Sequence, residues 1–166
     1  MRKVKKFKLT SEFIVDISGV KLFRIKALIE FGNVKAGDLG GYIEKEENLS
    51  HMGNAWVSGN AQVSGDAQVF GDARVFGNAW VSGDAWVSGN AQVSGDKDYA
   101  YAHGFGSCNR TTTFFRLKDG DVGVRCGCFY GTLAQFRDNV CETHGETKKA
   151  QEYLMLADLM DFRFKN

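Results

Sequence analysis

Two pairs of soft metal ligands lie in the last third of the chain. Cys126 and Cys128 are separated by one residue, and Cys141 and His144 by two. Alternate residues of a strand share a face, and residues three apart on a helix do so as well, so each pair would present its two side chains together. Four such ligands could form a tetrahedral zinc site. The favoured interpretation is that the cysteines are small core residues or belong to a Cys-Gly-Cys turn, with no cofactor bound.

His103 is the best candidate for a catalytic base. It lies in a glycine- and tyrosine-rich stretch that runs from Tyr101 to Gly106, and no carboxylate lies near it in the sequence to orient the ring. An imidazole can take a proton from a hydroxyl or an amine near neutral pH. His51 instead falls, by counting in sixes, at a valine position of the repeat described below, so we expect it to mark the end of that repeat.

Arginines and tyrosines around this stretch could bind a phosphate-bearing ring. A guanidinium group makes forked hydrogen bonds to a phosphate, and it also stacks on aromatic rings. The residues are Arg110, Arg116, Arg125, Tyr99, Tyr101 and Tyr130. Cross-strand pairing on a solvated hairpin would use the same residues, and it is the favoured interpretation.

A strict repeat supplies the scaffold for these side chains. Seven consecutive hexapeptides of the form G-[N/D]-A-x-V-[S/F] run from Gly53 to Ser94. A unit this short buries nothing alone, so the period predicts a solenoid in which neighbouring units stack. The alanines and valines would point inward, and the glycines with the adjacent Asn or Asp would form the corners.

The solenoid is expected to extend a little beyond the perfect repeats. Counting back by six from Ala55 reaches Leu49 and then Ile43, both apolar as an inward position requires. In the other direction Lys97 takes the place of an alanine and the pattern stops. The predicted solenoid therefore covers residues 41–96.

The outward positions of the repeat carry the candidate binding surface. The residue between alanine and valine alternates with inward residues, so it must point outward, as must the residue after the valine. The large side chains at these positions are Trp56, Phe70, Arg74, Phe76, Trp80 and Trp86. So many aromatics are rarely left exposed, so we expect burial against the flanking segments or other subunits. The alternative is a stacking platform for a planar ligand or a patch for a protein partner.

The flanking segments have patterns of their own. The first 40 residues predict a β-rich cap with a tight turn at Ser18-Gly19. After the solenoid, a loop over 99–109 and a hairpin about Lys118–Asp121 precede two helices, an order written ββαα.

Capping residues mark both of these helices. Thr132 and Gln135 form a capping box, Gly145 ends the first helix, and Thr147 caps the second. The predicted domains are a cap over 1–40, a solenoid over 41–96 and a C-terminal domain over 97–166.

The charge balance argues against nucleic acid and membrane partners. The formal net charge is +1, and no apolar run approaches the roughly 18 residues of a membrane span. The first 30 residues contain eight lysines and arginines but only three acidic residues. We assign this local excess of positive charge to a solvated sheet edge. Lys8 and Glu12 interrupt the segment where a secretory signal would need its apolar stretch. We therefore expect a cytoplasmic protein with reduced cysteines.

The repeat resembles the hexapeptide-repeat family of left-handed parallel β-helices, in which three hexapeptides make one triangular coil. That resemblance implies a short left-handed β-helix of about three coils and a homo-oligomer, with a trimer as the first expectation. The family includes acyltransferases in which one histidine acts as general base while acyl-CoA lies along the solenoid. For this chain the resemblance implies an alternative function as an acyltransferase with His103 as the base.

The whole layout resembles phage and prophage hexapeptide-repeat proteins of bacteria. The lead over 19–41, the repeats that follow it, and the tail segments 126–133 and 142–145 carry this likeness. It implies a non-enzymatic protein that binds and blocks or sequesters a component of the bacterial host cell, such as a defence protein or its nucleotide signal. The expected binding residues are Trp56, Phe70, Arg74, Phe76, Trp80, Trp86, Tyr99, Tyr101, His103 and Arg110. A structural oligomerisation or spacer protein is the remaining alternative.

Overall fold

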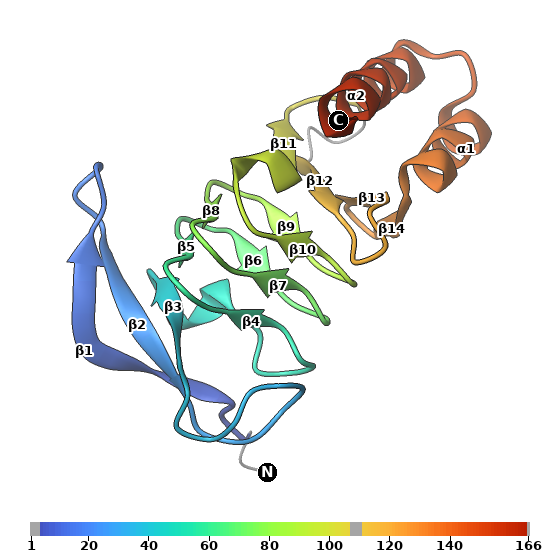
Figure 1. The fold of residues 1–166 in the computed structure, drawn as a ribbon. Helices are drawn as coiled ribbons and strands as arrows, with labels where there is room; N and C mark the ends of the chain where they lie inside the picture. Colours follow the sequence, from blue (N-terminus) through green and yellow to red (C-terminus); the bar gives the residue numbers. More distant parts are fainter. Residues whose placement is uncertain (1–3, 107–110, 166) are drawn as a thin grey trace.

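The chain is mainly β-structure and ends in two helices. The computed structural model describes residues 4–106 and 111–165 (Figure 1). A stack of short strands forms the middle of the molecule, a β-hairpin stands beside its N-terminal end, and a small sheet with two helices follows its C-terminal end (Figure 1). No helix within these described ranges is long and apolar enough to cross a membrane.

Seven two-residue strands make up the stack. They are β4 (Trp56–Val57), β5 (Gln62–Val63), β6 (Gln68–Val69), β7 (Arg74–Val75), β8 (Trp80–Val81), β9 (Trp86–Val87) and β10 (Gln92–Val93). Each pairs in parallel with the strand three hexapeptides away, in the orders β4–β7–β10, β5–β8 and β6–β9. The parallel ladders confirm that the hexapeptides form a stacked solenoid repeat.

The inward and corner positions are those that the repeat predicts. The alanine and valine of every hexapeptide are at most 1% exposed. At the corners, glycines of successive coils approach one another closely. A Cβ on Gly53 would lie 2.6 Å from the carbonyl oxygen of Gly71, and the φ of Gly53 is +72°. Both the close approach and the left-handed backbone therefore require glycine there.

The predicted register of the first coil is wrong. Leu49 forms a parallel bridge with Val69, and Ile43 pairs with Val63, so both occupy valine positions and not alanine positions. His51 and Met52 are two extra residues at a corner, and His51 is not at a valine position. Counting in sixes missed the insertion because Leu49 and Ile43 are apolar and satisfy either inward position.

The N-terminal cap shares a sheet with the solenoid. Its strands are β1 (Phe7–Val15), β2 (Lys21–Ala27) and β3 (Leu39–Ile43). These pair antiparallel, and β3 then pairs in parallel with β5, which gives a mixed sheet in the order β1-β2-β3-β5-β8. The β1–β2 connection passes through Gly19, whose φ is +84°. Because β3 spans the boundary predicted at residue 40, cap and solenoid are continuous.

The C-terminal domain has four strands where two were predicted. They are β11 (Tyr99–His103), β12 (Thr111–Arg116), β13 (Val122–Cys126) and β14 (Phe129–Thr132), antiparallel in that order. Part of the segment predicted as a loop over 99–109 is therefore a strand. The alanines of β11 and the glycine within β14 are unfavourable in strands, and pairing across the sheet outweighs them.

The two predicted helices are present with their caps. They are α1 (Leu133–His144) and α2 (Lys148–Phe164). Thr132 Oγ1 accepts a hydrogen bond from Gln135 N, and Gln135 Oε1 accepts one from Thr132 N, which completes the capping box. Adjacent residues of β12 separate two cores: Phe115 packs into the solenoid interior, and Phe114 packs beneath the helices.

Candidate functional site

The outward tryptophans of the solenoid have different environments. Trp56 is 5% exposed and packs against Phe7 and Phe31, with ring centroids 6.5 and 5.2 Å away. The prediction of burial against a flanking segment is confirmed for this residue. Trp80 and Trp86 are 37% and 36% exposed. Within the part of the chain that the structure describes, these two rings are the solenoid aromatics most open to a ligand.

The predicted binding residues do not converge on one site. Trp80 lies on the β5–β8 face, where its Nε1 donates a hydrogen bond to Gln62 Oε1. Arg74 and Phe76 line a small hollow of about 260 Å³ on the β4–β7–β10 face. Trp86 and His103 lie together in a larger hollow elsewhere. Arg110 lies outside the described residues.

The larger hollow forms where the β6–β9 face meets the C-terminal sheet, and we call it the β6–β9 groove. Its volume is about 650 Å³. It is lined by Asp66, Gln68, Asp84, Trp86, His103, Thr111, Arg125, Gly127 and Cys128. The solenoid thus supplies an aromatic ring and carboxylates, and the C-terminal sheet supplies cationic and polar groups.

Arg125 reaches from β13 to the solenoid and lies against two aromatic rings. Its Cζ atom is 5.3 Å from the ring centroid of Phe70 and 5.7 Å from that of Trp86. The two rings themselves meet edge to face, with centroids 6.1 Å apart. Arg125 Nε is buried without a hydrogen-bond partner, and no ion pair of Arg125 is found among the described residues. The Arg125 guanidinium is therefore held by cation–π contacts, with no carboxylate at ion-pair distance among the described residues.

The other predicted phosphate-clamping residues have structural roles. Arg116 forms an ion pair with Asp98 at 3.2 Å and donates a hydrogen bond to the carbonyl of Phe164. The Tyr101 hydroxyl lies against Gly83, and a methyl group on that glycine would overlap it. Tyr99 packs against the solenoid core. Among the described residues of the predicted clamp, only Arg125 lines the β6–β9 groove, whereas Tyr99 and Tyr101 line a separate hollow of about 280 Å³.

His103 lies at the edge of the β6–β9 groove and is exposed. Its Nδ1 is 2.7 Å from the hydroxyl of Thr111 on the neighbouring strand. Within residues 4–106 and 111–165, no carboxylate is hydrogen-bonded to His103. A serine-protease-like orientation by a carboxylate is thus absent from this part of the chain, and a hydroxyl orients the ring instead.

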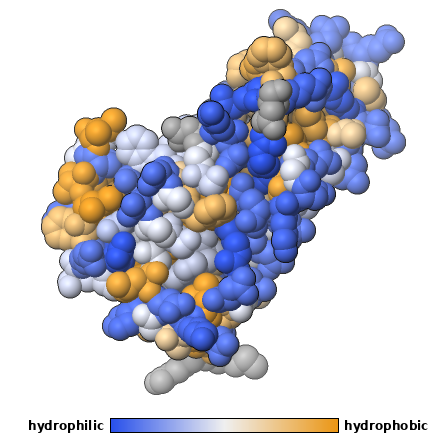
Figure 2. All heavy atoms as spheres, in the orientation of Figure 1, coloured by the Kyte–Doolittle hydropathy of each residue, from blue (hydrophilic) through white to orange (hydrophobic). Residues whose placement is uncertain are grey.

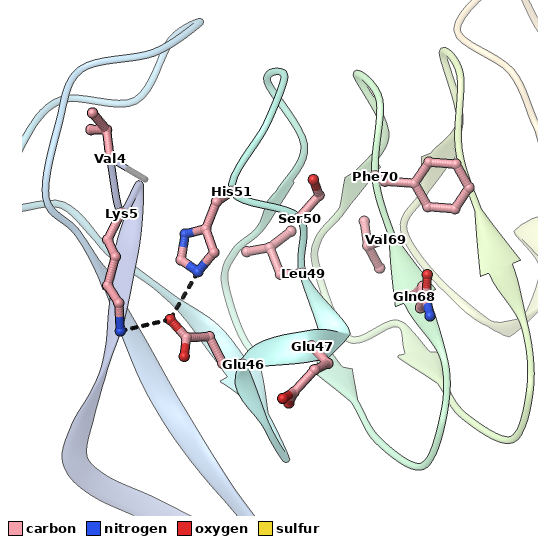
Figure 3. Close-up of a pocket in the computed structure, with 10 residues that line it drawn as sticks. All are labelled: Val4, Lys5, Glu46, Glu47, Leu49, Ser50, His51, Gln68, Val69 and Phe70. Carbon is pink, nitrogen blue, oxygen red and sulfur yellow. Dashed lines mark hydrogen bonds and ion pairs between the residues drawn. The ribbon is translucent and has the colours of Figure 1, made fainter. Parts of the chain in front are cut away.

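A second hollow, of about 630 Å³, lies further along the same solenoid face (Figure 3). Gln68 lines both hollows, so they are consecutive along the β6–β9 face. In the second one, Glu46 accepts contacts from Lys5 Nζ at 3.1 Å and from His51 Nε2 at 2.9 Å. The hydrogen bond from Lys5, followed by that from His51, holds the pKa of the Glu46 carboxyl below its usual range.

This arrangement at His51 could not be predicted from the repeat. The Nδ1 of His51 accepts a hydrogen bond from Lys6 N, and its ring stacks on Phe7 at 4.3 Å. Since both ring nitrogens have partners, His51 links the cap to the first coil and is not a free base. The signal that could have revealed it is the break in hexapeptide spacing caused by the His51-Met52 insertion.

The proposed zinc ligands are only partly brought together. Cys126, Cys128 and His144 line one hollow of about 410 Å³, whereas Cys141 is exposed on α1 and is not among the lining residues. Thr112 Oγ1 donates to Cys126 Sγ at 3.2 Å. No group of three or more His, Cys, Asp or Glu in 4–106 and 111–165 is arranged to hold a metal ion. A zinc site remains a prediction from spacing.

Other exposed apolar surfaces lie on the flanking domains. Figure 2 shows one over the β1–β2 hairpin and another over the helices. Ile17 at the hairpin is 90% exposed, and Phe162 of α2 is 80% exposed. The exposed apolar area is therefore shared among the hairpin, the helices and the solenoid faces, whereas the sequence drew attention to the solenoid alone.

Comparison with known proteins bears on the repeat. The family model of the YdcK β-solenoid repeat matches residues 67–83. That segment contains β6, β7 and β8, so the match agrees with the parallel ladders seen here. No curated protein matches the chain.

Proposed function

We propose that this chain is a non-enzymatic binding protein whose ligand occupies the β6–β9 groove. The observation that carries the proposal is Arg125, held between Phe70 and Trp86 with no ion pair within the described residues. A groove of about 650 Å³ is within the size range of small-molecule sites, which combine an apolar surface with a few oriented polar groups. Both conditions are met at Trp86 and Arg125.

The charges along the β6–β9 face favour a compact ligand over a polyanion. Asp66 and Asp84 line the groove, and Glu46 and Glu47 line the neighbouring hollow. Nucleic acid binding depends on several cations that neutralise successive phosphates. A face with this many carboxylates is a poor match for such a ligand.

The biological role that we propose follows the phage-type layout of the sequence. The protein would act in the cytoplasm of a bacterial host cell and would bind and sequester a host component, either a defence protein or its nucleotide signal. We further propose that the solenoid is left-handed with about three coils and that the protein is a trimer. The 18-residue spacing between paired strands supports the coil, and the resemblance to the hexapeptide-repeat family supports handedness and trimer.

A second candidate function is acyl transfer with His103 as general base. The observation that favours it is the position of His103 in the same groove as Trp86. His103→Ala should abolish acetyl-CoA-dependent acylation of an amine or hydroxyl acceptor and leave ligand binding at Trp86 in place. Wild-type protein that shows no turnover, or a His103→Ala variant with unchanged turnover, would exclude this candidate.

Native mass spectrometry tests the binding function. The wild-type protein is incubated with a small-molecule extract of bacterial cells and compared with Trp86→Ala and Trp80→Ala. These two tryptophans are about equally exposed, but only Trp86 lines the groove. We expect an added mass on wild type and Trp80→Ala that Trp86→Ala lacks. No added mass on any of the three, or the same mass on all three, would contradict the proposal and leave the spacer interpretation. The same spectra report the number of subunits.

A further inference from the structure

We propose that Arg125 binds the phosphate of a mononucleotide-class ligand whose base lies against the exposed ring of Trp86. The proposal rests on the proposed function, because it names the chemical class of the ligand in the β6–β9 groove. It assigns separate roles to the guanidinium group, the indole ring and the polar groups around them.

The guanidinium group of Arg125 is held in a position from which it can bind an oxyanion. The contacts to Phe70 and Trp86, at 5.3 and 5.7 Å from ring centroids, bring two aromatic rings to the Arg125 guanidinium and fix the side chain. The N–H edge of a guanidinium then makes paired hydrogen bonds to a planar oxyanion edge, such as that of a phosphate or carboxylate. The Nε of Arg125 is buried and has no hydrogen-bond partner, so hydrogen bonds to a ligand in the groove would come from the two terminal amino groups of the guanidinium.

Two other arginines among the described residues of the C-terminal domain are already paired with carboxylates. Arg116 is paired with Asp98 at 3.2 Å, and Arg137 is paired with Asp158 at 3.0 Å. Their charges are neutralised by acidic side chains within the fold. Arg125 is the arginine of this domain that both lines the groove and lacks a carboxylate partner among the described residues.

The rest of the groove fits a planar ring with polar edges better than a lone anion. The 36% exposed indole of Trp86 offers a surface on which a base can stack. Gln68 and Asp84 line the groove beside it, and their oxygens can accept hydrogen bonds from the N–H groups of a base. A free phosphate or a small carboxylate would leave these groups and most of the 650 Å³ unused.

The same groove should disfavour additional phosphates. Asp66 and Asp84 line it, and the nearby Lys45 is already paired with Asp66 at 2.8 Å. Because Lys45 already neutralises Asp66, the unpaired charges at the groove are one guanidinium, Arg125, and one carboxylate, Asp84, so a second or third phosphate would add negative charge without meeting a further unpaired cation among the lining residues. We therefore expect a nucleoside monophosphate to bind at least as tightly as the corresponding triphosphate.

Isothermal titration calorimetry on the full chain tests the proposal. The probes are AMP and GMP, ribose 5-phosphate, adenosine, ATP, and N-acetyltryptophan, which joins a carboxylate to a planar ring. We expect saturable binding of at least one monophosphate, and binding roughly tenfold or more weaker for ribose 5-phosphate and adenosine, since each lacks one of the two contacts. N-acetyltryptophan binding as tightly as the monophosphate would show a carboxylate site and overturn the nucleotide assignment.

A second part of the experiment repeats the titrations on variants of Arg125. Arg125→Lys keeps the charge and loses the forked geometry, so affinity for the monophosphate should fall about tenfold, and Arg125→Met should lower it further. Arg74→Met is the matched control, because Arg74 also lies beside aromatic residues in a hollow but on another face. Unchanged affinity in Arg125→Lys and Arg125→Met, or an equal loss in Arg74→Met, would overturn the role of Arg125.

The two proposals fail in different ways. A Trp86-dependent added mass in the native spectra, without binding of any monophosphate, would overturn the ligand class and leave the binding function standing. Neither a Trp86-dependent mass nor monophosphate binding would overturn both. A melting temperature within about 2 °C of wild type for Arg125→Lys confirms that loss of affinity is not loss of the fold.

Discussion

The ammonium group of Lys6 caps the backbone carbonyl of Ala55 at 2.6 Å, and it also contacts the carbonyl of Gly53 at 3.4 Å. One coil further on, the equivalent carbonyls of Gly71 and Ala73 accept backbone N–H groups from the preceding coil. The first coil has no coil before it, so the 1% exposed side chain of Lys6 replaces the missing strand. A solenoid end that would otherwise leave buried acceptors unpaired is thereby satisfied.

Between the first and second coils, a side chain likewise replaces a missing backbone donor. Asn48 Nδ2 donates to the carbonyls of Gly65 and Ala67, at 3.1 and 2.9 Å. At the opposite end, Thr113 Oγ1 accepts the backbone N–H of Trp86 at 2.9 Å, where another coil would have supplied a carbonyl. Side chains from the flanking domains thus cover both ends of the stack. The described ends of the stack therefore offer no unpaired edge to another subunit, and the proposed trimer would have to form through the sides of the solenoid.

Replacing Lys6 should destabilise the protein through the carbonyls that it leaves unpaired. In Lys6→Met the apolar stem remains while the donor is lost, so unfolding free energy should fall by about 1–3 kcal/mol. Chemical denaturation measures the change. Lys8→Met, two residues further along the chain in β1 and exposed, is the control and should stay within about 0.5 kcal/mol of wild type. Equal behaviour of the two variants would contradict the capping role.

Lys6 should also give the protein a specific pH dependence. Burial, partly opposed by the charge of Asp72, lowers the pKa of Lys6 from 10.5 to about 8. In the folded state the proton leaves near pH 8, whereas the unfolded chain keeps it to about 10.5. The unfolded state therefore binds more protons between these values, and stability rises with pH there.

Comparison with Lys6→Met isolates this effect, because other titrating groups are common to both proteins. Between pH 7.5 and 9.5 the wild type should gain stability relative to Lys6→Met, at a slope of up to about 1.4 kcal/mol per pH unit. Denaturation at several pH values measures the two profiles. Parallel profiles would show that Lys6 keeps an ordinary pKa in the folded state.

The contact between Gly89 and Tyr130 should make this glycine irreplaceable. Gly89 has a φ of +62°, and a methyl group on it would overlap the Tyr130 hydroxyl. Gly89→Ala should therefore lower stability by more than about 1 kcal/mol, and adding Tyr130→Ala, which removes the hydroxyl together with the ring carbons that the methyl group would also overlap, should recover part of the loss relative to Tyr130→Ala alone. Gly95→Ala is the control, since Gly95 has extended backbone and open space around it. Thermal denaturation distinguishes these variants, and no recovery in the double variant would assign the whole loss to backbone strain.

The hydroxyl of Thr113 should stabilise the C-terminal end of the stack, where it accepts the backbone N–H of Trp86. Thr113 is 0% exposed, so Thr113→Val would bury the Trp86 N–H without an acceptor and lower stability by about 1–3 kcal/mol. Thr113→Ser keeps the oxygen and should retain most of the stability. Amide hydrogen exchange at Trp86 gives a direct measurement, and unchanged protection in Thr113→Val would contradict the assigned bond.

The sequence predicted the scaffold well because each hexapeptide position has one physical role. Small and β-branched residues fill the interior, and glycine fits the corners, so the repeat defines the stack without tertiary information. The His51-Met52 insertion was not predicted, because Leu49 is compatible with both the alanine and the valine position of the repeat. The strand β11 was also missed: its alternating tyrosines favour a strand, but its alanines and the glycines at 104 and 106 led to its prediction as a loop, and it pairs with β12 in the structure.

The candidate site was predicted in fragments. Trp86 and His103 were named as binding residues and Arg125 as part of a phosphate clamp, but nothing in the sequence joined them. Phe70, Trp86 and Arg125 come from three separate strands or their ends, and only the docking of the C-terminal sheet on the β6–β9 face brings them together. Tyrosines predicted to bind a ligand instead pack on the corner glycines of the solenoid.

The repeat offers a final test of the site. Phe70 and Phe76 occupy the position at which the other hexapeptides have serine. Phe70→Ser restores the hexapeptide and should leave the stack folded, while Arg125 loses one of its two aromatic contacts. Phe76→Ser makes the same change one hexapeptide later, on a different face. We expect affinity for the groove ligand to fall about tenfold or more in Phe70→Ser, through the lost cation–π and edge-to-face contacts. Phe76→Ser should bind as wild type does. Equal affinities of the two variants would mean that Phe70 only fills space and that Arg125 is oriented by Trp86 alone.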